Sequence, residues 1–277
     1  MPRIVLLLSM FIAYCAHGQK AEIPFDYKRD FRNILQQTQN EEGPLAYKKL
    51  LPRFQANDTG LTNAEVLALM IGFTENTYYR PFEDMDKEQE IFDLNEEKKY
   101  EKALEEALRY LSDHPLSLRV LKEASYCYHS LNRKDSADYY MDLVEKVMNA
   151  MIYSGSGKKP EAPIFSLGLA DGEWFIPNIG MKVANKNTDW NKNNHFIEII
   201  DASKNVDDLM RFYFVIEHAK AKIDDDKVEA TDEKKKKKGD KKKDDKKWQS
   251  KKEKKEKKDK KEKTVTPETP PTQAPGS

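Results

Sequence analysis

The sequence predicts an α+β fold that is mainly α-helical, with helical hairpins followed by a small antiparallel β-sheet and a disordered C-terminal tail. Three observations lead to this prediction. Apolar residues recur at helical spacing from about residue 27 to residue 151. Short β-favouring runs separated by turn residues follow Ser154, and a lysine-rich segment of low complexity comes near the end. We expect residues 19–222 to form a single globular domain, helical over 19–153 and β-rich over 154–222.

The first 18 residues have the pattern of a secretory signal peptide. Arg3 precedes an apolar run at 4–14, and a small-x-small triplet at 16–18 follows. We therefore expect cleavage near Gly18 and Gln19 and a secreted or periplasmic mature protein. A bilayer-spanning helix needs roughly 20 apolar residues, so no transmembrane segment is predicted.

The two cysteines have different expected fates. Cys15 leaves with the signal peptide; the alternative, a lipoprotein acylated at Cys15, is disfavoured because Tyr14 stands where lipid-attachment signals place a small residue. Cys127 then remains alone, so no intrachain disulfide is expected. We predict that Cys127 is a small buried residue on a helix, with a reactive thiol or an intermolecular bridge as the alternatives.

The C-terminal segment 223–277 is predicted to be disordered, lysine-rich first and rich in threonine and proline at its end. Between Glu233 and Lys263 there are 19 lysines and 8 acids, with almost no apolar residue to offset the entropy of ordering. The preceding part from Gln19 to Asp232 carries 28 basic and 39 acidic residues. An acidic body thus bears a basic tail, for which we expect weak association with anionic surfaces but no specific nucleic-acid recognition, because no aromatic ladder is present.

The helical part begins with three predicted helices. Apolar residues at Tyr27, Phe31, Ile34 and Leu35 follow the spacing of one helix face. A second, short helix is expected to start at Pro44. Both helices are assigned from period and turn residues alone.

The third helix has the most complete start signal in the chain. Thr62 and Glu65 form an S/T-x-x-E capping box, and Leu61 and Val66 are placed for a hydrophobic staple. The apolar run 66–73 follows directly. We expect this helix to be largely buried.

Residues 84–151 show two copies of a helical pattern that resembles tetratricopeptide repeats. These repeats are 34 residues long, with small residues where their two helices touch and a proline near the end. Ala103 and Ala137 lie 34 residues apart, Pro115 falls at the terminal proline, and the second copy begins at Leu118. The other packing positions are taken by Tyr100 in the first copy and by Leu121, Ala124, Ser125, Tyr128, Met141 and Val144 in the second. The alternative is a helical bundle with coincidental spacing.

The β-rich part is predicted from short apolar runs at 164–169, 174–176, 195–200 and 210–216. Asp171-Gly172, within the segment 170–173, is a strong signal for a two-residue hairpin turn. Residues 185–194, rich in Asn, Lys and Asp, are expected to form an exposed loop. The Gly-Ser-Gly-Lys segment 155–158 is interpreted as a linker, because Ile152 stands where a phosphate-binding loop needs glycine.

Several stretches together resemble a known family: GLTNAEVLALMIGFT, YYRPF, KYEKALEEALRYLSDHPLSLRVL, DSADYYM and PIFSLGLADGEWFI. In this order they are similar to an uncharacterised family of exported bacterial proteins, mostly from Bacteroidetes-type organisms, catalogued as domain of unknown function 4919. The resemblance covers about Phe25 to Ile216 and implies no activity, substrate or catalytic residue. The lysine-rich tail lies outside it.

We predict no catalytic residue, metal site or cofactor. The sequence has no GxSxG, no HExxH and no cysteine pair at metal spacing. On a strand, His195 and Glu198 would point to opposite faces. His195 and His218 could meet across neighbouring strands near Glu217 or Asp201, but half-buried polar contacts are the simpler interpretation.

The predicted binding residues lie on the helix at 118–131. Arg119, Lys122, Tyr126 and His129 share one face, which in stacked helical hairpins lines the concave groove. Such a stripe suits a carboxylate or a peptide end. The alternative is that the preceding helix or the sheet covers this face and that its cations meet the body's own acids.

These observations favour an exported protein-interaction or scaffold protein, not an enzyme, whose tetratricopeptide-like helical surface binds a protein or peptide partner. The alternative is an envelope enzyme, hydrolase-like, with a site between the helices and the β-rich region.

Overall fold

The computed structural model describes residues 25–205 and 208–227. The predicted signal peptide and residues 228–277 of the predicted tail lie outside the described residues. The elements in chain order are α1 (Tyr27–Gln39), α2 (Tyr47–Gln55), α3 (Asn63–Phe73), α4 (Pro81–Glu96), α5 (Tyr100–Asp113), α6 (Leu118–Ser130), α7 (Lys134–Ser154), β1 (Ile164–Phe165), α8 (Asp171–Asn178), β2 (Lys182–Trp190), β3 (Phe196–Ser203) and β4 (Leu209–Val215). Residues 217–227 are also helical. The fold class, mainly α with a small sheet, is as predicted.

The described residues 25–205 and 208–223 form one compact unit. None of the described helices combines the length and the apolar character that a membrane crossing requires.

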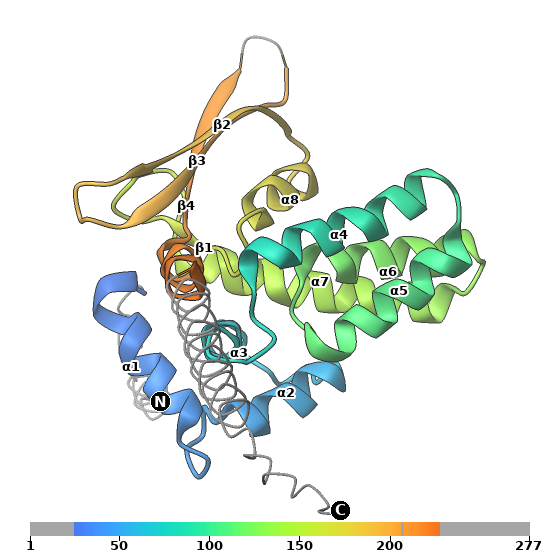
Figure 1. Cartoon of the computed structure of the whole chain (residues 1–277), viewed down its shortest axis with the longest axis horizontal. Coiled ribbons are helices and arrows are strands. Elements are labelled where there is room, and N and C mark those ends of the chain that lie inside the picture. The colour runs from blue at the N-terminus through green and yellow to red at the C-terminus, as the bar shows by residue number, and fades with distance from the viewer. Residues whose placement is uncertain (1–24, 206–207, 228–277) are drawn as a thin grey trace, which may run out of the picture. The chain divides into compact units, whose positions relative to one another are not determined.

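The helix α3 is the most buried helix of the N-terminal part, as its sequence predicts. The capping box is present: Thr62 Oγ1 accepts the Glu65 N–H at 3.2 Å, and the Glu65 carboxylate accepts the Thr62 N–H at 2.8 Å. Helices α1, α2 and α7 pack around α3 (Figure 1), so that nearly every side chain from Val66 to Phe73 is buried. A Cβ atom on Gly72 would lie 2.9 Å from Thr38 Oγ1, so glycine is needed where α1 crosses. The helix α2 begins three residues after the predicted Pro44.

Two helical hairpins, α4–α5 and α6–α7, occupy the predicted repeat region. Their connecting turns are alike: Lys98 and Asn132, 34 residues apart, both have positive φ angles, 60° and 58°. The N–H of the next residue bonds back five positions in each turn, from Lys99 to Leu94 and from Arg133 to Tyr128.

The small residues predicted at helix contacts are buried, namely Ala103, Ala124, Ser125 and Ala137. Ser125 donates to the Ala137 carbonyl at 2.8 Å and so links α6 to α7. Met141, predicted as a packing position, is 37% exposed instead. That position lies on the outer side of α7, because the helix turns a different face to α3.

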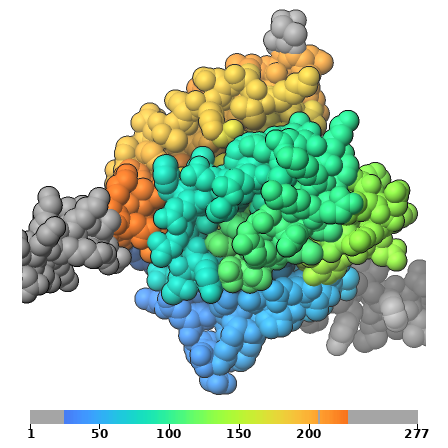
Figure 2. Space-filling model, turned by 45° about the vertical axis from the view of Figure 1, so that its right-hand side comes forward, coloured from blue at the N-terminus to red at the C-terminus, as the bar shows by residue number. Residues whose placement is uncertain are grey.

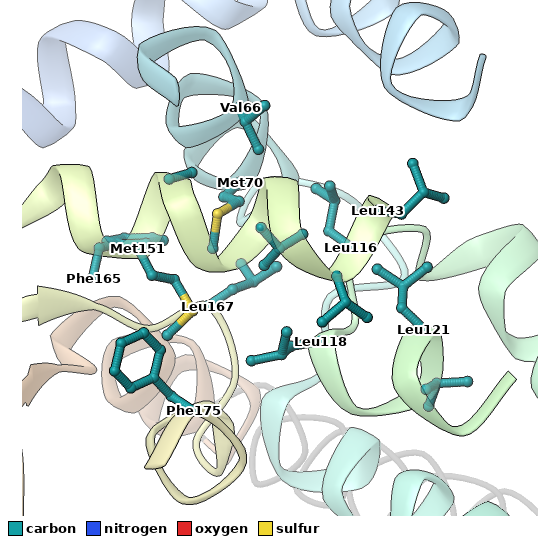
Figure 3. Close-up of a cluster of buried hydrophobic side chains, with 14 of the residues drawn as sticks. Val66, Met70, Leu116, Leu118, Leu121, Leu143, Met151, Phe165, Leu167 and Phe175 are labelled. Atoms are coloured by element: carbon teal, nitrogen blue, oxygen red, sulfur yellow. The ribbon is translucent and has the colours of Figure 1, made fainter. Parts of the chain in front are cut away.

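The hydrophobic core lies around α7, the longest of the described helices. Figure 3 shows side chains of α7 together with those of α3, α6, β1, α8 and the loops before α6 and after β1: Val66, Met70, Leu116, Leu118, Leu121, Leu143, Met151, Phe165, Leu167 and Phe175. Each such side chain stabilises the fold by roughly 1.5–3 kcal/mol when fully buried. The core therefore joins the helical part to the β-rich part.

The sheet is mixed, which corrects the antiparallel prediction. Its strand order is β1-β4-β3-β2, and β1 runs parallel to β4 while the other pairs are antiparallel. The strand predicted at 164–169 is only two residues long. It pairs with the last strand instead of its neighbour in sequence, an arrangement that a run of apolar residues cannot reveal.

The predicted hairpin turn at 170–173 is wrong, because Asp171 and Gly172 begin the helix α8. The strand predicted at 174–176 is part of the same helix. A Cβ atom on Gly172 would lie 2.5 Å from a Glu198 carboxylate oxygen, so this glycine serves the close packing of α8 on the sheet and not a turn. Asp171 accepts the Gly168 N–H at 2.7 Å and thereby closes the loop before the helix.

The predicted loop at 185–194 is also wrong over most of its length, since β2 extends from Lys182 to Trp190. Every residue of β2 is exposed. An edge strand with no buried face shows no alternation of apolar and polar residues, although its backbone pairs with β3 from Lys182 to Trp190, with one irregularity at Ala184. Composition alone therefore predicted a loop.

Candidate binding groove and buried acidic pocket

A groove of about 1110 Å³ runs between α4 and α5, on the face that Figure 2 presents at its centre. We call it the acidic groove. Its charged lining residues are eight acids, Glu83, Asp84, Asp86, Glu90, Asp93, Glu97, Glu106 and Asp113, and four bases, Arg80, Lys87, Lys102 and Arg109. Ile91, Leu94, Tyr78 and Tyr110 supply apolar surface between the charges. The groove is thus negatively charged and partly apolar.

Some of these charges are already paired. Lys87 binds Glu90 at 2.7 Å, and Arg109 binds Glu106. Asp86 lies on the same helix face as Glu90, one turn before it, and is exposed. Acids therefore remain in excess along the rim of the acidic groove.

A smaller cavity of about 30 Å³ adjoins the acidic groove, because Asp84, Tyr110 and His114 line both. We call it the buried acidic pocket. Its polar lining comes from α4 (Asp84, Glu88), α5 and the loop after it (Tyr110, His114, Ser117), the segment before α4 (Tyr79), and the loop before α8 with the first residue of that helix (Gly168, Asp171). Neither lysine nor arginine lines it. The pocket thus brings together residues from both the helical and the β-rich parts.

The wall shared with the groove is built around His114. Its Nε2 atom lies 3.1 Å from Asp84 Oδ1 and 2.9 Å from the Tyr78 carbonyl, and its Nδ1 atom lies 3.3 Å from the Tyr110 carbonyl. The Tyr110 ring stacks on the imidazole at 4.0 Å. Burial lowers the pKa of His114, but these acceptors outweigh burial and raise it above its ordinary value. Both imidazole nitrogens thus lie within hydrogen-bonding distance of acceptors.

Two carboxyls of the pocket are buried without an ion pair in the described part of the chain. Glu88 accepts only the Ser117 hydroxyl, at 2.6 Å, and Asp171 accepts the Gly168 N–H. Burial, with repulsion from Asp171, raises the pKa of Glu88 to about 8. Burial likewise raises the pKa of Asp171 to about 6, although backbone N–H groups lower it in part. Such groups are costly to bury, so the pocket is suited to accept a proton or a cation.

The structure does not bring Arg119 into an open stripe with the other predicted binding residues. Its guanidinium lies over the rings of Trp174 and Phe92, 3.9 and 5.0 Å from their centroids, and donates to Gln89 at 2.8 Å. The side chain is only 4% exposed. Arg119 therefore ties α4 and α6 to α8, close to the arrangement that the covered-face alternative describes.

The three remaining predicted residues stay near the surface of α6. Lys122 is half-buried, Tyr126 is 48% exposed, and His129 is exposed. The Tyr126 ring meets Tyr100 edge-on at 5.9 Å. None of the three lines the acidic groove or the buried acidic pocket.

The two C-terminal histidines do approach each other, around Tyr27. The Tyr27 ring lies 5.2 Å from the His195 ring and 5.9 Å from the His218 ring. His195 binds Glu217 at 2.8 Å, whereas burial lowers the pKa of His218 to about 4 and keeps it neutral. Asp201 binds Arg211 instead. Neither histidine lines the groove or the pocket, and among the described residues no cluster of His, Cys, Asp or Glu is arranged to hold a metal ion.

Cys127 is buried on α6, as predicted. Its thiol contacts Asn95 Oδ1 at 3.0 Å, and Asn95 also donates to the Glu123 carboxylate at 2.7 Å. Burial raises the pKa of the thiol to about 11, so Cys127 is poorly nucleophilic.

The sequence predictions missed the carboxyls of the pocket altogether. Glu88 and Asp84 lie one turn apart on a helix full of acids, and nothing local distinguishes them from their exposed neighbours. The Leu-Gly-Leu-Ala-Asp segment at 167–171 carried a usable signal, since an acid after a glycine-containing apolar stretch also fits a helix start.

Comparisons with known proteins identify one relation. The model of a family described as a domain of unknown function, DUF4919, matches residues 32–225. That segment includes all of α2 to β4, and hence the groove and the pocket. No curated protein matches the chain, and no solved structure does. The motif resemblance to this family is thereby confirmed.

Proposed function

This chain belongs to the DUF4919 family, and we propose that it is an exported interaction protein that binds a cationic segment of a partner polypeptide in the acidic groove. The excess of acids over bases along a groove of this size is the observation that carries the proposal. Charge complementarity both speeds association and selects partners. A lysine- or arginine-rich segment is the matching occupant.

The apolar surface within the groove supports a polypeptide rather than a bare cation. Ile91, Leu94 and Tyr110 lie between the rows of acids. Lysine and arginine side chains bury their methylene stems on such surface while their charged ends reach the carboxylates. A simple cation would gain nothing from these residues.

The hairpin geometry supports the same kind of function. The turns at Lys98 and Asn132 repeat each other at the 34-residue period of tetratricopeptide repeats. Stacked hairpins of this type present extended surfaces to partners. The half-buried Lys122 and the exposed Tyr126 and His129 on α6 remain a second predicted contact surface, without the buried Arg119. Export, inferred from the N-terminal signal pattern, places the partner in the envelope or outside the cell.

The enzyme alternative is favoured by one observation, the location of the buried acidic pocket between the helices and the β-rich part. Paired acids with raised pKa values are common in hydrolase sites. The pocket, however, holds about 30 Å³, enough for a group of the size of water but not for a substrate. Binding is therefore the better-supported function.

The test is the binding of a fluorescein-labelled hexalysine to the full chain, measured by anisotropy at low ionic strength. The variant Asp86→Lys/Glu90→Lys is expected to weaken binding at least about tenfold, because it reverses two rim charges. The control Asp138→Lys/Glu145→Lys makes the same charge change on the exposed surface of α7. Equal affinity of the two variants would contradict the groove.

A further inference from the structure

The buried acidic pocket lies directly beside the acidic groove. The two cavities share Asp84, Tyr110 and His114 as lining residues. Beyond this shared wall, the pocket ends against Tyr79, whose hydroxyl donates to the Leu167 carbonyl at 2.8 Å. The side chains of Asp84, Tyr110 and His114 thus form the boundary between the two cavities, and a side chain from a segment in the groove would enter the pocket past them.

The size of the pocket restricts what can enter. A volume of about 30 Å³ accepts one group of the size of a water molecule. An ammonium group has this size, while the planar guanidinium of arginine is larger. Size alone thus separates the two cationic side chains.

The hydrogen-bonding capacity of the pocket is only partly used. Glu88 is 8% exposed and engages one of its oxygens with Ser117. Its second oxygen has no protein donor in the described part of the chain, and no lysine or arginine lines the pocket. A ligand that brings donors and positive charge completes this site.

The aromatic rings of the pocket favour the same ligand. Phe73, Tyr79 and Tyr110 line the cavity together with the acids. Aromatic faces attract ammonium groups, and an ammonium offers three donors for carboxylate oxygens. A metal ion is less suitable, since the described residues include no cluster arranged to coordinate one.

We infer that the buried acidic pocket receives the ammonium group of one lysine side chain from the cationic segment bound in the acidic groove. This inference rests on the proposed function and adds specificity to it. The groove attracts any cationic segment, and the pocket selects lysine over arginine at one position.

Proton release is the expected signature of this binding. The titratable and charged groups around Glu88 are Asp84 on the same helix, Tyr110 and His114 from α5 and its C-terminal end, Arg119 from α6, Asp171 from α8 and Tyr79 from the preceding segment. Because the pKa of Glu88 is raised to about 8, its carboxyl carries a proton at pH 7 when the pocket is empty. A bound ammonium favours the ionised carboxyl, so a proton leaves as lysine enters.

The experiment compares hexalysine with hexaarginine on the full chain, by calorimetry at pH 7 in two buffers of different ionisation enthalpy. We expect hexalysine to bind about tenfold more tightly and to release about one proton, whereas hexaarginine releases none. In Glu88→Gln, which keeps an acceptor for Ser117, both the preference and the proton release should disappear. Retention of both in this variant, or the lack of a preference in the unaltered chain, overturns the inference.

Two further arms separate this inference from the proposed function. Glu83→Gln removes an exposed acid of the groove and should weaken both peptides equally. A second arm uses the unaltered chain and a series of hexaarginine peptides in which one arginine at a time is replaced by lysine. Only one position of the lysine should restore tight binding. Equal affinity for all the peptides of the series would contradict the pocket. If neither peptide binds the unaltered chain, the proposed function fails together with the inference. If both bind equally and the groove variant weakens both, only the inference fails.

Discussion

The helices α3 and α4 follow each other in the chain but bury their residues in opposite ways. The helix α3 is apolar from Val66 to Phe73 and is enclosed by other helices, with its polar groups confined to the capping box. The N-cap residue of α4 makes no side-chain cap, and half of the residues of this helix are charged, yet it buries Glu88 and Asn95. The first arrangement stabilises the fold, whereas the second costs stability. We attribute the retention of the buried acid Glu88 on α4 to binding, since functional sites are commonly kept at the expense of stability.

The largest change in the free energy of unfolding is expected from a substitution in the buried core of α3. Leu67→Ala should lower the free energy of unfolding by about 2–5 kcal/mol, because the side chain is 1% exposed and its loss leaves a cavity. Leu108→Ala, at a surface position of α5, should change it by less than about 0.5 kcal/mol. Urea denaturation of both variants measures the difference, and similar losses would contradict the assignment of the core to α3.

A stabilising effect is expected from Glu88→Gln on α4. The pKa of Glu88 is raised from 4.5 to about 8 by burial, so the folded state holds a proton that the unfolded state releases, and stability is lost as pH rises through this window. The variant escapes this loss and should be more stable than the unaltered chain by about 3 kcal/mol at pH 7. Near pH 4 the two should be alike.

Thermal or urea unfolding at both pH values measures this effect. Glu83→Gln serves as the control, since Glu83 is exposed on the same helix. A variant that is less stable than the unaltered chain at pH 7 would show that the buried carboxylate is compensated within the protein. If Glu88→Gln is more stable than the unaltered chain and has also lost the preference for lysine, then Glu88 lowers the stability of the protein but is needed for lysine binding.

The smallest effect concerns the start of α3. Thr62→Ala removes the hydroxyl that accepts the Glu65 N–H and should cost about 1 kcal/mol. Thr62→Ser keeps the hydroxyl and should lie within a few tenths of a kcal/mol of the unaltered chain. Chemical denaturation of the two variants provides the measurement, and equal losses would exclude the cap as the cause.

The helices with local signals could be predicted from the sequence, while the β-rich part could not be predicted in the same detail. The capping box at Thr62 and the apolar run that follows it identified α3 at its true start. In contrast, β2 is an exposed edge strand with no buried face, so its composition predicted a loop. The Asp-Gly pair at the start of α8 predicted a hairpin turn, but its glycine is required by the close packing of α8 on the sheet. The predicted stretches near β3 and β4 were right. The equally buried apolar stretch at 174–176 proved helical, so burial of apolar residues did not by itself distinguish strand from helix.

The sequence by itself determined the elements whose information is local: helix periodicity, a cap, and the small residues where hairpins touch. It also determined the excess of acids in the body. Only the tertiary structure decided which acids are buried, because the segment 166–171 returns from the sheet to α4 and places Asp171 at the same cavity as Glu88, 83 residues away in sequence. Burial and hydrogen bonding depend on such distant contacts, and a charged helix shows the same pattern whether one of its acids faces water or a pocket.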